Sequence, residues 1–279
     1  MPELPEVRAH AERLAAAFDG AVLRRFEALS FTALKTYAPE PGAALDRPVT
    51  AVRSRGKLLL VELAPVTFVV HLMQGGRLRP DDKQARKVKG GLARWTFDDG
   101  RALLLTEAGT DRKAGVWVRD GDHETQEPLS GLGPDADRVD AARLHEIVRS
   151  SANRRLHTWL RDQDGVAGLG RRLANEVCWQ ARLSPFASIA KLDDDEIDRL
   201  HAAIGVAVGE SLAAERERDD MSASKDRPGA VHHRVGLDCV RCGDTIRSVE
   251  YRDYTVAYCP TCQTGGKVLA DNTTSKFLR

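Results

Sequence analysis

Four cysteines near the C-terminus have the spacing of a metal site. Cys239 and Cys242 form one Cys-x2-Cys pair, and Cys259 and Cys262 form a second pair after sixteen intervening residues. This spacing is typical of a four-thiolate zinc site on a β-ribbon. Four thiolates leave no position for water, so we expect one structural Zn²⁺. The fifth cysteine, Cys178, lies in a helical stretch and is expected to be a buried apolar residue.

The first residues offer a different chemistry. Pro2 follows the initiator methionine, so we expect removal of Met1, which leaves a secondary amine. A free α-amino group has a pKa near ~7.7–8.0 and is partly nucleophilic at neutral pH. Attack of this amine on a sugar C1′ gives an iminium, which makes the C2′ hydrogen acidic. Glu3 and Glu6, on one helical face, are candidates to move protons or stabilise the cation. Alternatively, Pro2 and Pro5 only begin a helix, and spacing alone favours this simpler interpretation.

The elements that must position these residues change character along the chain. A helix with an apolar face is predicted up to Phe18, and Gly20 is placed to end it. Residues 21–118 contain short apolar runs typical of antiparallel strands, with a hairpin turn at 98–100. These features predict a β-sandwich with an attached helix. The strand runs are VTAVRSR, KLLLVEL, TFVVHL, LARWTF, RALLLT and GVWVR.

The second half of the chain is predicted to be helical. Helical patterns occur in AARLHEIVRSS, NRRLHTWLRDQ and RRLANEVCWQARL, and a long helix capped by Asp193 and Glu196 continues to about Arg216. Residues 221–231 are expected to be a mobile loop, and the zinc segment is expected to contain a hairpin. The predicted organisation is an N-terminal domain at 1–128, a linker at 129–143, a helical domain at 144–230, and a zinc ribbon with a basic tail at 231–279.

Composition excludes several classes of protein. The 279 residues are 42% apolar and 30% charged, which is typical of a folded globular chain and not of a disordered one. No apolar run approaches the ~18 residues that a membrane span needs, and the N-terminus does not resemble a signal peptide. The 42 basic and 41 acidic residues give a net charge of +1. This balance argues against a purely electrostatic nucleic-acid coat protein and permits a local basic surface.

Several motifs together resemble the Fpg/Nei family of bacterial DNA glycosylases. The N-terminal MPELPEV and the C-terminal zinc pattern carry most of the resemblance. Further family-like segments follow in order and at family-like spacing. They are RGKLLL at 55–60, HLMQGG at 71–76, GLG at 168–170 through LSP at 183–185, and VHHRVG at 231–236.

The resemblance implies a multidomain α+β fold. It consists of an N-terminal helix with an antiparallel β-sandwich, then a helical domain with a helix-two-turn-helix and a zinc β-ribbon. The implied activity is that of a bifunctional enzyme, which removes an oxidised or alkylated base through a Schiff base and cleaves the abasic strand by β- or β/δ-elimination. Pro2 would be the nucleophile, and Glu3 the general acid/base that helps to open the sugar ring, with possible support from Glu6. Lys57 would position or protonate the leaving base and hold a phosphate.

The same resemblance implies a set of DNA contacts. Met73 or Gln74, in the loop that follows His71, would fill the gap left by a turned-out base. Arg112, in a second loop at 108–115, would face the orphaned base. The remaining contacts would come from the backbone N–H groups of Gly168 and Gly170, from Arg171, and from the zinc hairpin between Arg252 and Tyr254.

The chain departs from the family pattern in its DNA contacts. Arg171 stands where asparagine is usual, Tyr254 where arginine is usual, and Ala114 where phenylalanine is usual. The segment before the zinc ribbon is also short. These changes spare the nucleophile, so we expect the lyase chemistry to persist with an altered choice of lesion.

The expected partner is damaged duplex DNA, bound by a monomer that has no membrane contact and is located in the cytoplasm with the nucleoid. One alternative is a protein that binds damaged or abasic sites with little or no catalysis. Another is a sandwich unrelated to the family, with the ribbon acting as a protein-interaction module.

Overall fold

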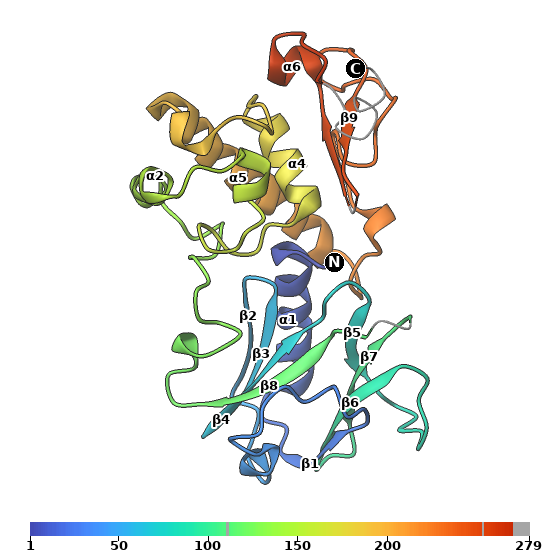
Figure 1. The fold of residues 1–279 in the computed structure, drawn as a ribbon. Coiled ribbons are helices and arrows are strands. Elements are labelled where there is room, and N and C mark those ends of the chain that lie inside the picture. Colours follow the sequence, from blue (N-terminus) through green and yellow to red (C-terminus); the bar gives the residue numbers. More distant parts are fainter. Residues whose placement is uncertain (110–111, 253, 270–279) are drawn as a thin grey trace. The chain divides into compact units, whose positions relative to one another are not determined.

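The chain divides into an N-terminal and a C-terminal unit. The computed structural model describes residues 1–109, 112–252 and 254–269. Contacts divide the chain between Gly131 and Leu132 (Figure 1). Each unit has its own buried apolar core. This boundary lies within the range expected for the linker. Part of the expected second DNA loop, 110–111, and the end of the expected tail, 270–279, lie outside the described residues.

Unit 1 combines one α-helix with two antiparallel sheets among its described residues. Its elements are α1 (Leu4–Phe18), β1 (Leu23–Ala28), η1 (Pro41–Ala44), β2 (Ala51–Arg55), β3 (Leu58–Leu63), β4 (Val66–His71), β5 (Gly76–Pro80), β6 (Gly91–Phe97), β7 (Ala102–Glu107), β8 (Gly115–Asp120) and η2 (His123–Thr125). One sheet has the order β1-β6-β7-β5 and the other the order β2-β3-β4-β8. The expected β-sandwich with an attached helix is therefore confirmed.

Aromatic rings from both sheets meet in the core of unit 1. Phe26 of β1 stacks on Phe68 of β4 with ring centroids 5.2 Å apart. Trp95 of β6 packs edge-on against Phe68 at 5.6 Å. Aromatic pairs in these geometries add to the free energy gained by burying their area, so they fix how the sheets face each other.

Strands β1 and β5 are absent from the runs predicted by sequence. Each carries two arginines, Arg24 and Arg25 in β1, Arg77 and Arg79 in β5, and both strands lie at the edge of their sheet. An edge strand needs only one buried face, and charged residues on the other discourage pairing with a second chain. In β1, two adjacent arginines interrupt the alternation that usually reveals a strand.

Unit 2 is mainly helical and ends in a two-stranded ribbon. Its elements are α2 (Ala141–Ser150), α3 (Leu156–Trp159), α4 (Arg171–Gln180), η3 (Ile189–Lys191), α5 (Asp194–Arg216), η4 (Ser224–Asp226), β9 (Arg247–Glu250), β10 (Thr255–Tyr258) and α6 (Pro260–Thr264). The capping box predicted for the long helix is present, since Asp193 and Glu196 each accept the other's backbone N–H. Helix α2 begins at Ala141, inside the range expected for the linker.

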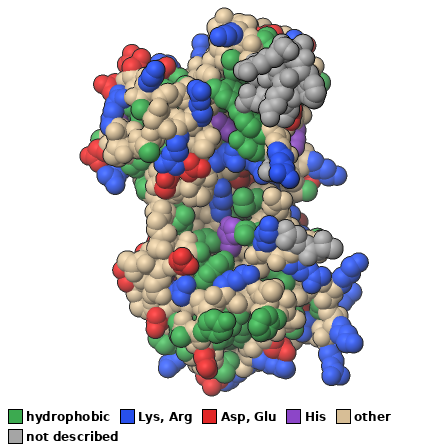
Figure 2. Space-filling view, in the orientation of Figure 1, with side chains coloured by type: hydrophobic (Ala, Val, Ile, Leu, Met, Phe, Trp, Pro, Cys, Tyr) green, Lys and Arg blue, Asp and Glu red, His purple; other side chains and the backbone are tan. Residues whose placement is uncertain are grey.

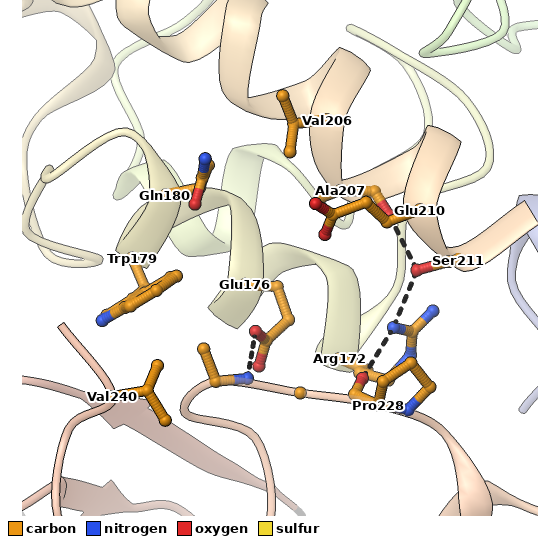
Figure 3. Close-up of a pocket in the computed structure, with 12 residues that line it drawn as sticks. Arg172, Glu176, Trp179, Gln180, Val206, Ala207, Glu210, Ser211, Pro228 and Val240 are labelled. Carbon is orange, nitrogen blue, oxygen red and sulfur yellow. Dashed lines mark hydrogen bonds between the residues drawn. The ribbon is translucent and has the colours of Figure 1, made fainter. Parts of the chain in front are cut away.

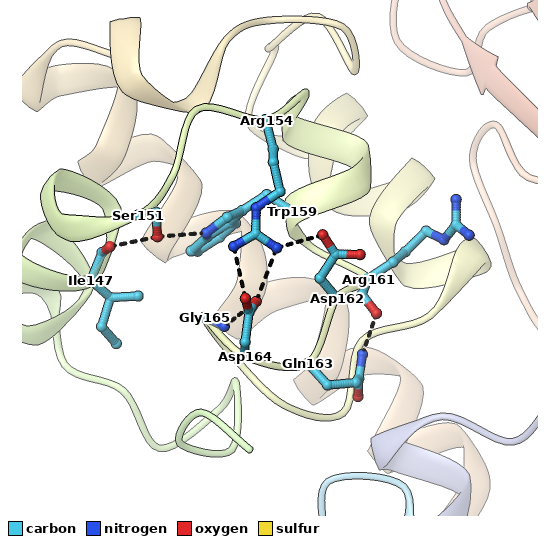
Figure 4. A network of polar contacts seen from close by, with 9 residues as sticks. All are labelled: Ile147, Ser151, Arg154, Trp159, Arg161, Asp162, Gln163, Asp164 and Gly165. Carbon is cyan, nitrogen blue, oxygen red and sulfur yellow. Dashed lines mark hydrogen bonds and ion pairs between the residues drawn. The ribbon is translucent and has the colours of Figure 1, made fainter. Parts of the chain in front are cut away.

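The helix expected at 153–163 forms only over α3. Arg154 pairs with Asp162 at 2.6 Å and with Asp164 at 2.7 Å, and these ion pairs turn the chain back after Trp159 (Figure 4). Gln163 has a φ of +65°, which a right-handed helix cannot contain. The chain after α3 is therefore an ordered loop leading into α4.

The loop expected to be mobile, 221–231, is anchored at both ends. Met221 is 5% exposed and Val231 is fully buried. In the part of the chain that the structure describes, no helix is both long and apolar enough to cross a lipid bilayer.

Candidate functional site

Helix α1 begins with two carboxylates that cap one another. The backbone N–H of Glu3 donates to Oε2 of Glu6 at 2.6 Å, and the Glu3 side chain accepts the backbone N–H of Glu6. Both side chains are buried, at 3% and 0% exposure, beside the buried Pro2. The capping box therefore fixes two carboxylates directly beside the residue that becomes the N-terminus when Met1 is removed.

Lys57 lies at the same end of unit 1 as Pro2. Helix α1 runs antiparallel to β2. Near the start of the helix, Arg8 Nε donates to Ser54 Oγ at 3.4 Å. Past its end, the N–H of Gly20 donates to Val49 O at 2.9 Å. The start of α1 therefore lies beside the β2–β3 turn that carries Lys57. That turn has Gly56 at φ +55°, as a two-residue hairpin requires.

His71 lies next to Lys57 across the sheet. In the register, Leu58 of β3 faces His71 of β4, and His71 faces Gly115 of β8. Burial, with the charge of Lys57 as the second cause, lowers the pKa of His71 to about 4. The imidazole is therefore neutral at pH 7 and can exchange a hydrogen bond without adding a charge.

The chain after His71 makes a tight turn that presents two side chains. Met73 has a φ of +49°, a conformation that costs free energy for a residue other than glycine. Gln74 is exposed, whereas Met73 is half-buried. A side chain at Gly76 would collide with the backbone of Leu72, so glycine is required where the turn closes. The turn thus holds Gln74 outward in a fixed place.

The loop between β7 and β8 packs beside this turn. A side chain at Gly75 would meet the carbonyl oxygen of Ala108 at 3.2 Å, so the two loops are in close contact. Glu107 is 4% exposed, and its Oε2 accepts the backbone N–H of Ala114 at 2.7 Å. Ala114 is therefore held inward, while Arg112 is exposed.

The predicted residues of unit 1 thus gather at one end of the sandwich. We call this end the loop edge, and it comprises the start of α1, the β2–β3 turn, residues 72–75 and the described residues of 108–114. Pro2, Glu3, Lys57, His71 and Gln74 all belong to it. The arrangement places carboxylates and a lysine with Pro2, whose nitrogen becomes a secondary amine once Met1 is removed, as expected from the sequence; these are the groups that imine chemistry needs.

In unit 2, the turn before α4 is organised by Gln163. Its Oε1 accepts the N–H of Gly168 at 2.9 Å, and its Nε2 donates to Leu169 O at 2.8 Å. The N–H of Gly168 is thus already bonded within the turn, contrary to the expectation that it is open to a phosphate. Gly170 is the N-cap of α4, and Arg171 is exposed at the first turn, where the helix dipole favours an anion.

Two arginines from the helical part of unit 2 lie over the ring of Tyr254 in the ribbon. The Arg161 guanidinium lies 4.2 Å from the ring centroid, and that of Arg171 lies 5.7 Å away. Tyr251 stacks on the same ring at 4.7 Å. Arg252, at the hairpin tip, is exposed. Tyr254 therefore joins the hairpin to the start of α4 through cation–π contacts.

Helix α4 also holds the segment that leads into the ribbon. The buried Glu176 carboxylate accepts three backbone N–H groups, from Ala230 at 2.6 Å, Val231 at 3.1 Å and His232 at 2.8 Å. Asn175 Nδ2 lies 2.9 Å from His232 Nδ1. Burial is the main cause that raises the pKa of Glu176. These contacts fix the ribbon segment on α4, and sequence reasoning missed them because they join residues more than fifty positions apart.

A pocket of about 260 Å³ lies beside Glu176, between α4, α5 and residues 228–230 (Figure 3). Arg172 crosses it, donating to Ser211 Oγ at 3.1 Å and to Pro228 O at 3.3 Å. The pocket is thus bridged by structural contacts. Figure 2 shows both basic and acidic side chains on the visible surface of each unit.

The four ribbon cysteines form a cluster suited to one metal ion. Their sulfur atoms all lie within 4.8 Å of one another, with Cys242 to Cys259 at 3.4 Å and Cys239 to Cys262 at 3.9 Å. Thiolates bound tetrahedrally at about 2.3 Å from Zn²⁺ lie about 3.8 Å apart, so the residues fit zinc. Trp179 Nε1 donates to Cys239 Sγ at 3.4 Å, a contact that supports a thiolate. Cys178 is separate and fully buried, and burial raises its pKa, as expected for a structural residue.

Comparisons with known proteins agree with this architecture. Residues 1–116 match the formamidopyrimidine-DNA glycosylase N-terminal domain, and residues 131–221 match the H2TH domain of the same proteins. A formamidopyrimidine-DNA glycosylase of Chloroflexus aurantiacus is 31% identical over 278 residues, covering 94% of this chain and 98% of its own. The chain therefore belongs to the formamidopyrimidine-DNA glycosylase (Fpg) family.

Other relatives are similar over different extents. An uncharacterized formamidopyrimidine-DNA glycosylase-like protein of Mycobacterium tuberculosis is 37% identical over 150 residues, which is 53% of this chain and 94% of the relative. The structure of MutM in complex with DNA containing carbocyclic 8-oxo-G has a TM-score of 0.82 at 22% identity, covering 94% of this chain and 100% of MutM. Lactococcus lactis Fpg bound to DNA with an abasic site also has a TM-score of 0.82 at 22% identity, covering 94% and 99%. These structures establish the fold.

Proposed function

We propose that this protein is a DNA glycosylase of base-excision repair that also cleaves the strand at the resulting abasic site. The observation that carries the proposal is the convergence of Pro2, Glu3 and Lys57 at the loop edge of a chain that belongs to the Fpg family. A protein that only binds DNA has no need for an amine, a buried carboxylate and a lysine at one place.

In the proposed reaction, the secondary amine of Pro2 forms a bond to C1′ of the damaged nucleotide. The C1′–N bond to the base breaks, and the base leaves with a proton that Lys57 supplies or positions. Glu3 accepts the proton that the Pro2 nitrogen loses on attack and delivers it to the ring oxygen O4′, so that the sugar opens and an iminium remains between Pro2 and C1′. Because Glu3 is held by the capping box, its carboxylate is positioned before the substrate arrives.

Strand cleavage follows from the iminium. A base removes the C2′ proton, the electron pair forms a C=C bond, and the C3′–O bond breaks with the phosphate as leaving group. In β/δ-elimination a base next removes the C4′ proton, the electron pair forms a second C=C bond, and the C5′–O bond breaks with the other phosphate as leaving group. Water finally hydrolyses the iminium and regenerates the amine. The neutral His71, next to Lys57, is placed to bond a phosphate or a water at this edge without a further charge.

We propose that unit 2 holds the duplex. Arg171 and Arg161, gathered on Tyr254, together with the N-terminus of α4, offer positive charge to the phosphate backbone. Arg252 at the hairpin tip adds a further contact. Zinc bound by the four cysteines would cross-link the ribbon, and this structural role keeps the hairpin that carries Tyr254 in place.

The experiment incubates the full chain with a panel of duplexes that each carry one damaged base. The panel includes a formamidopyrimidine, 8-oxoguanine, an oxidised pyrimidine and an alkylated base, with undamaged duplex as control. We expect release of the free base, detected by mass spectrometry, with cleavage of the same strand. Tight binding to damaged duplexes without base release or cleavage would instead identify a damage-binding protein.

A further inference from the structure

A fully exposed phenylalanine stands at a tight turn of unit 1. Residues 30–33 form this turn, with the Ala33 N–H donating to Ser30 O at 3.0 Å. Phe31 is the first central residue and is 99% exposed, whereas Ala33 beside it is fully buried. The phenylalanine ring therefore contributes nothing to the core of the unit, although the turn that carries it is well anchored.

Both sheets of the sandwich hold this turn. Before it, the N–H groups of Leu29 and Ser30 donate to Leu92 O of β6 at 2.8 and 3.2 Å. After it, Ala33 O accepts the N–H of Val116 of β8 at 2.8 Å. Anchors on two different sheets fix where Phe31 is presented.

The same anchors place the turn beside the strands that flank the loop carrying Arg112. That loop leaves β7 at Glu107 and enters β8 at Gly115. Leu92 lies in β6 beside the last residues of β7, because Gly91 is in register with Thr106. Val116 is the second residue of β8. The turn is thus attached next to both ends of the Arg112 loop.

The direction of the chain carries Phe31 toward the loop edge. Leu34 pairs with Val116 in parallel, so residues before Ala33 lie beyond the start of β8. A side chain at Gly115 would collide with the Lys35 side chain, which folds back to donate to Thr32 O at 2.6 Å. Because Gly115 is in register with His71, Phe31 belongs to the same end of the sandwich as Lys57.

An apolar side chain at this edge has a definite use if the proposed function holds. Turning a nucleotide out of a duplex costs a few kcal/mol, and proteins offset this by inserting an apolar or aromatic wedge into the base stack. The Arg112 loop presents a charged residue, and its apolar Ala114 is buried at 1% exposure and held by Glu107. Resting on the proposed function, we propose that Phe31 is the aromatic wedge that enters the base stack beside the turned-out nucleotide.

The chain contains a matched control for this proposal. Tyr37 belongs to the same segment and is 98% exposed. It lies toward the other end of β8, because Thr36 Oγ1 accepts the N–H of Val118 at 3.0 Å and the segment runs parallel to the strand. Removing Tyr37 therefore deletes an equally exposed aromatic ring away from the loop edge.

The test uses a duplex with one tetrahydrofuran abasic analogue next to 2-aminopurine, whose fluorescence rises when it is unstacked. We expect wild-type protein and Phe31→Trp to raise the fluorescence, and Phe31→Ala to lose this rise. We expect Phe31→Ala to bind the abasic duplex about 10-fold more weakly, which is about 1.4 kcal/mol and within the range for one base–aromatic stack. Its affinity for undamaged duplex and its melting temperature should stay unchanged, and Tyr37→Ala should match wild type throughout.

Covalent trapping with borohydride on a true abasic site separates this proposal from the proposed function. At saturating protein, Phe31→Ala should still form the adduct, because the ring supplies no group that makes or breaks a bond in the proposed reaction. A wild-type protein without an adduct would overturn the proposed function. Equal fluorescence and affinity of Phe31→Ala and wild type, or no fluorescence change with wild type, would overturn the wedge.

Discussion

His71 lies one step along the β3–β4 ladder from Lys57, because its partner in the register is Leu58. Burial and the charge of Lys57 lower the pKa of His71 to about 4, below the value of about 6.5 in an unfolded chain. The unfolded state therefore binds more protons between these two values. The stability contributed by the neutral imidazole is complete above pH 6.5 or so and is lost as the pH falls toward about 4.

The first prediction concerns this pair. Lys57→Gln removes the charge and leaves most of the burial, so we expect the pKa of His71 to rise above about 4 but to remain below about 6.5. NMR titration of the His71 imidazole measures it. His157→Gln is the control: it removes one imidazole signal from unit 2 and should leave the titration of His71 unchanged. An unchanged His71 pKa in Lys57→Gln would contradict the contact.

The second prediction concerns the capping box of α1. Glu3→Gln keeps a side-chain oxygen for the Glu6 N–H but loses the transferable proton. We expect base removal to fall by at least about 100-fold, with a loss of stability below about 1 kcal/mol. Asp193→Asn makes the equivalent change in the capping box of α5 and should leave activity intact. If both variants lose activity equally, the role of Glu3 is structural.

The third prediction concerns the anchoring of the ribbon segment. Glu176→Gln places an amide donor among three backbone donors, those of Ala230, Val231 and His232, so at least one hydrogen bond is lost. We expect a loss of about 2 kcal/mol in the free energy of unfolding. Glu210→Gln, an exposed change at the same pocket, is the control and should be neutral. Chemical denaturation measures both, and equal stability would refute the anchoring role.

The fourth prediction concerns the metal. Elemental analysis should find one zinc per chain, and Cys242→Ser should lower zinc content and weaken DNA binding by at least about 10-fold, since the hairpin loses its cross-link. Trapping at high protein concentration should survive, because the nucleophile belongs to unit 1. Tyr254→Ala separates the DNA contact from the metal, because this variant should weaken DNA binding while its zinc content stays normal. DNA affinity unaffected by complete zinc loss would contradict the account.

An element of this fold can be predicted from the sequence when the pattern that determines it lies among neighbouring residues. Apolar strands such as β3 and β4, and the capped helix α5, are predictable because their patterns lie within one element. The cluster of four cysteines is predictable because the spacing of the two Cys-x2-Cys pairs is a short sequence pattern. The helix predicted around α3 is cut short because Arg154 pairs with acidic residues beyond it, which no helical pattern reveals.

Features that depend on distant residues were not predictable. The link from Asn175 to His232 and the gathering of Arg161 and Arg171 on Tyr254 appear only when the fold brings these segments together. Phe31 is a further case. No sequence pattern marks Phe31, and only the fold shows that it stands at an anchored turn with its side chain 99% exposed.

The central claim is that the Pro2 amine forms a covalent imine with an abasic site, and borohydride trapping tests it most directly. Purified protein, with its N-terminus established by mass spectrometry as Pro2, is mixed with a duplex that carries one abasic site and is reduced. The account predicts a covalent protein–DNA adduct that is lost when the N-terminal amine is blocked and falls sharply in Pro2→Gly. Wild-type protein that binds the duplex but gives no adduct, or an adduct that persists with a blocked amine, would contradict it.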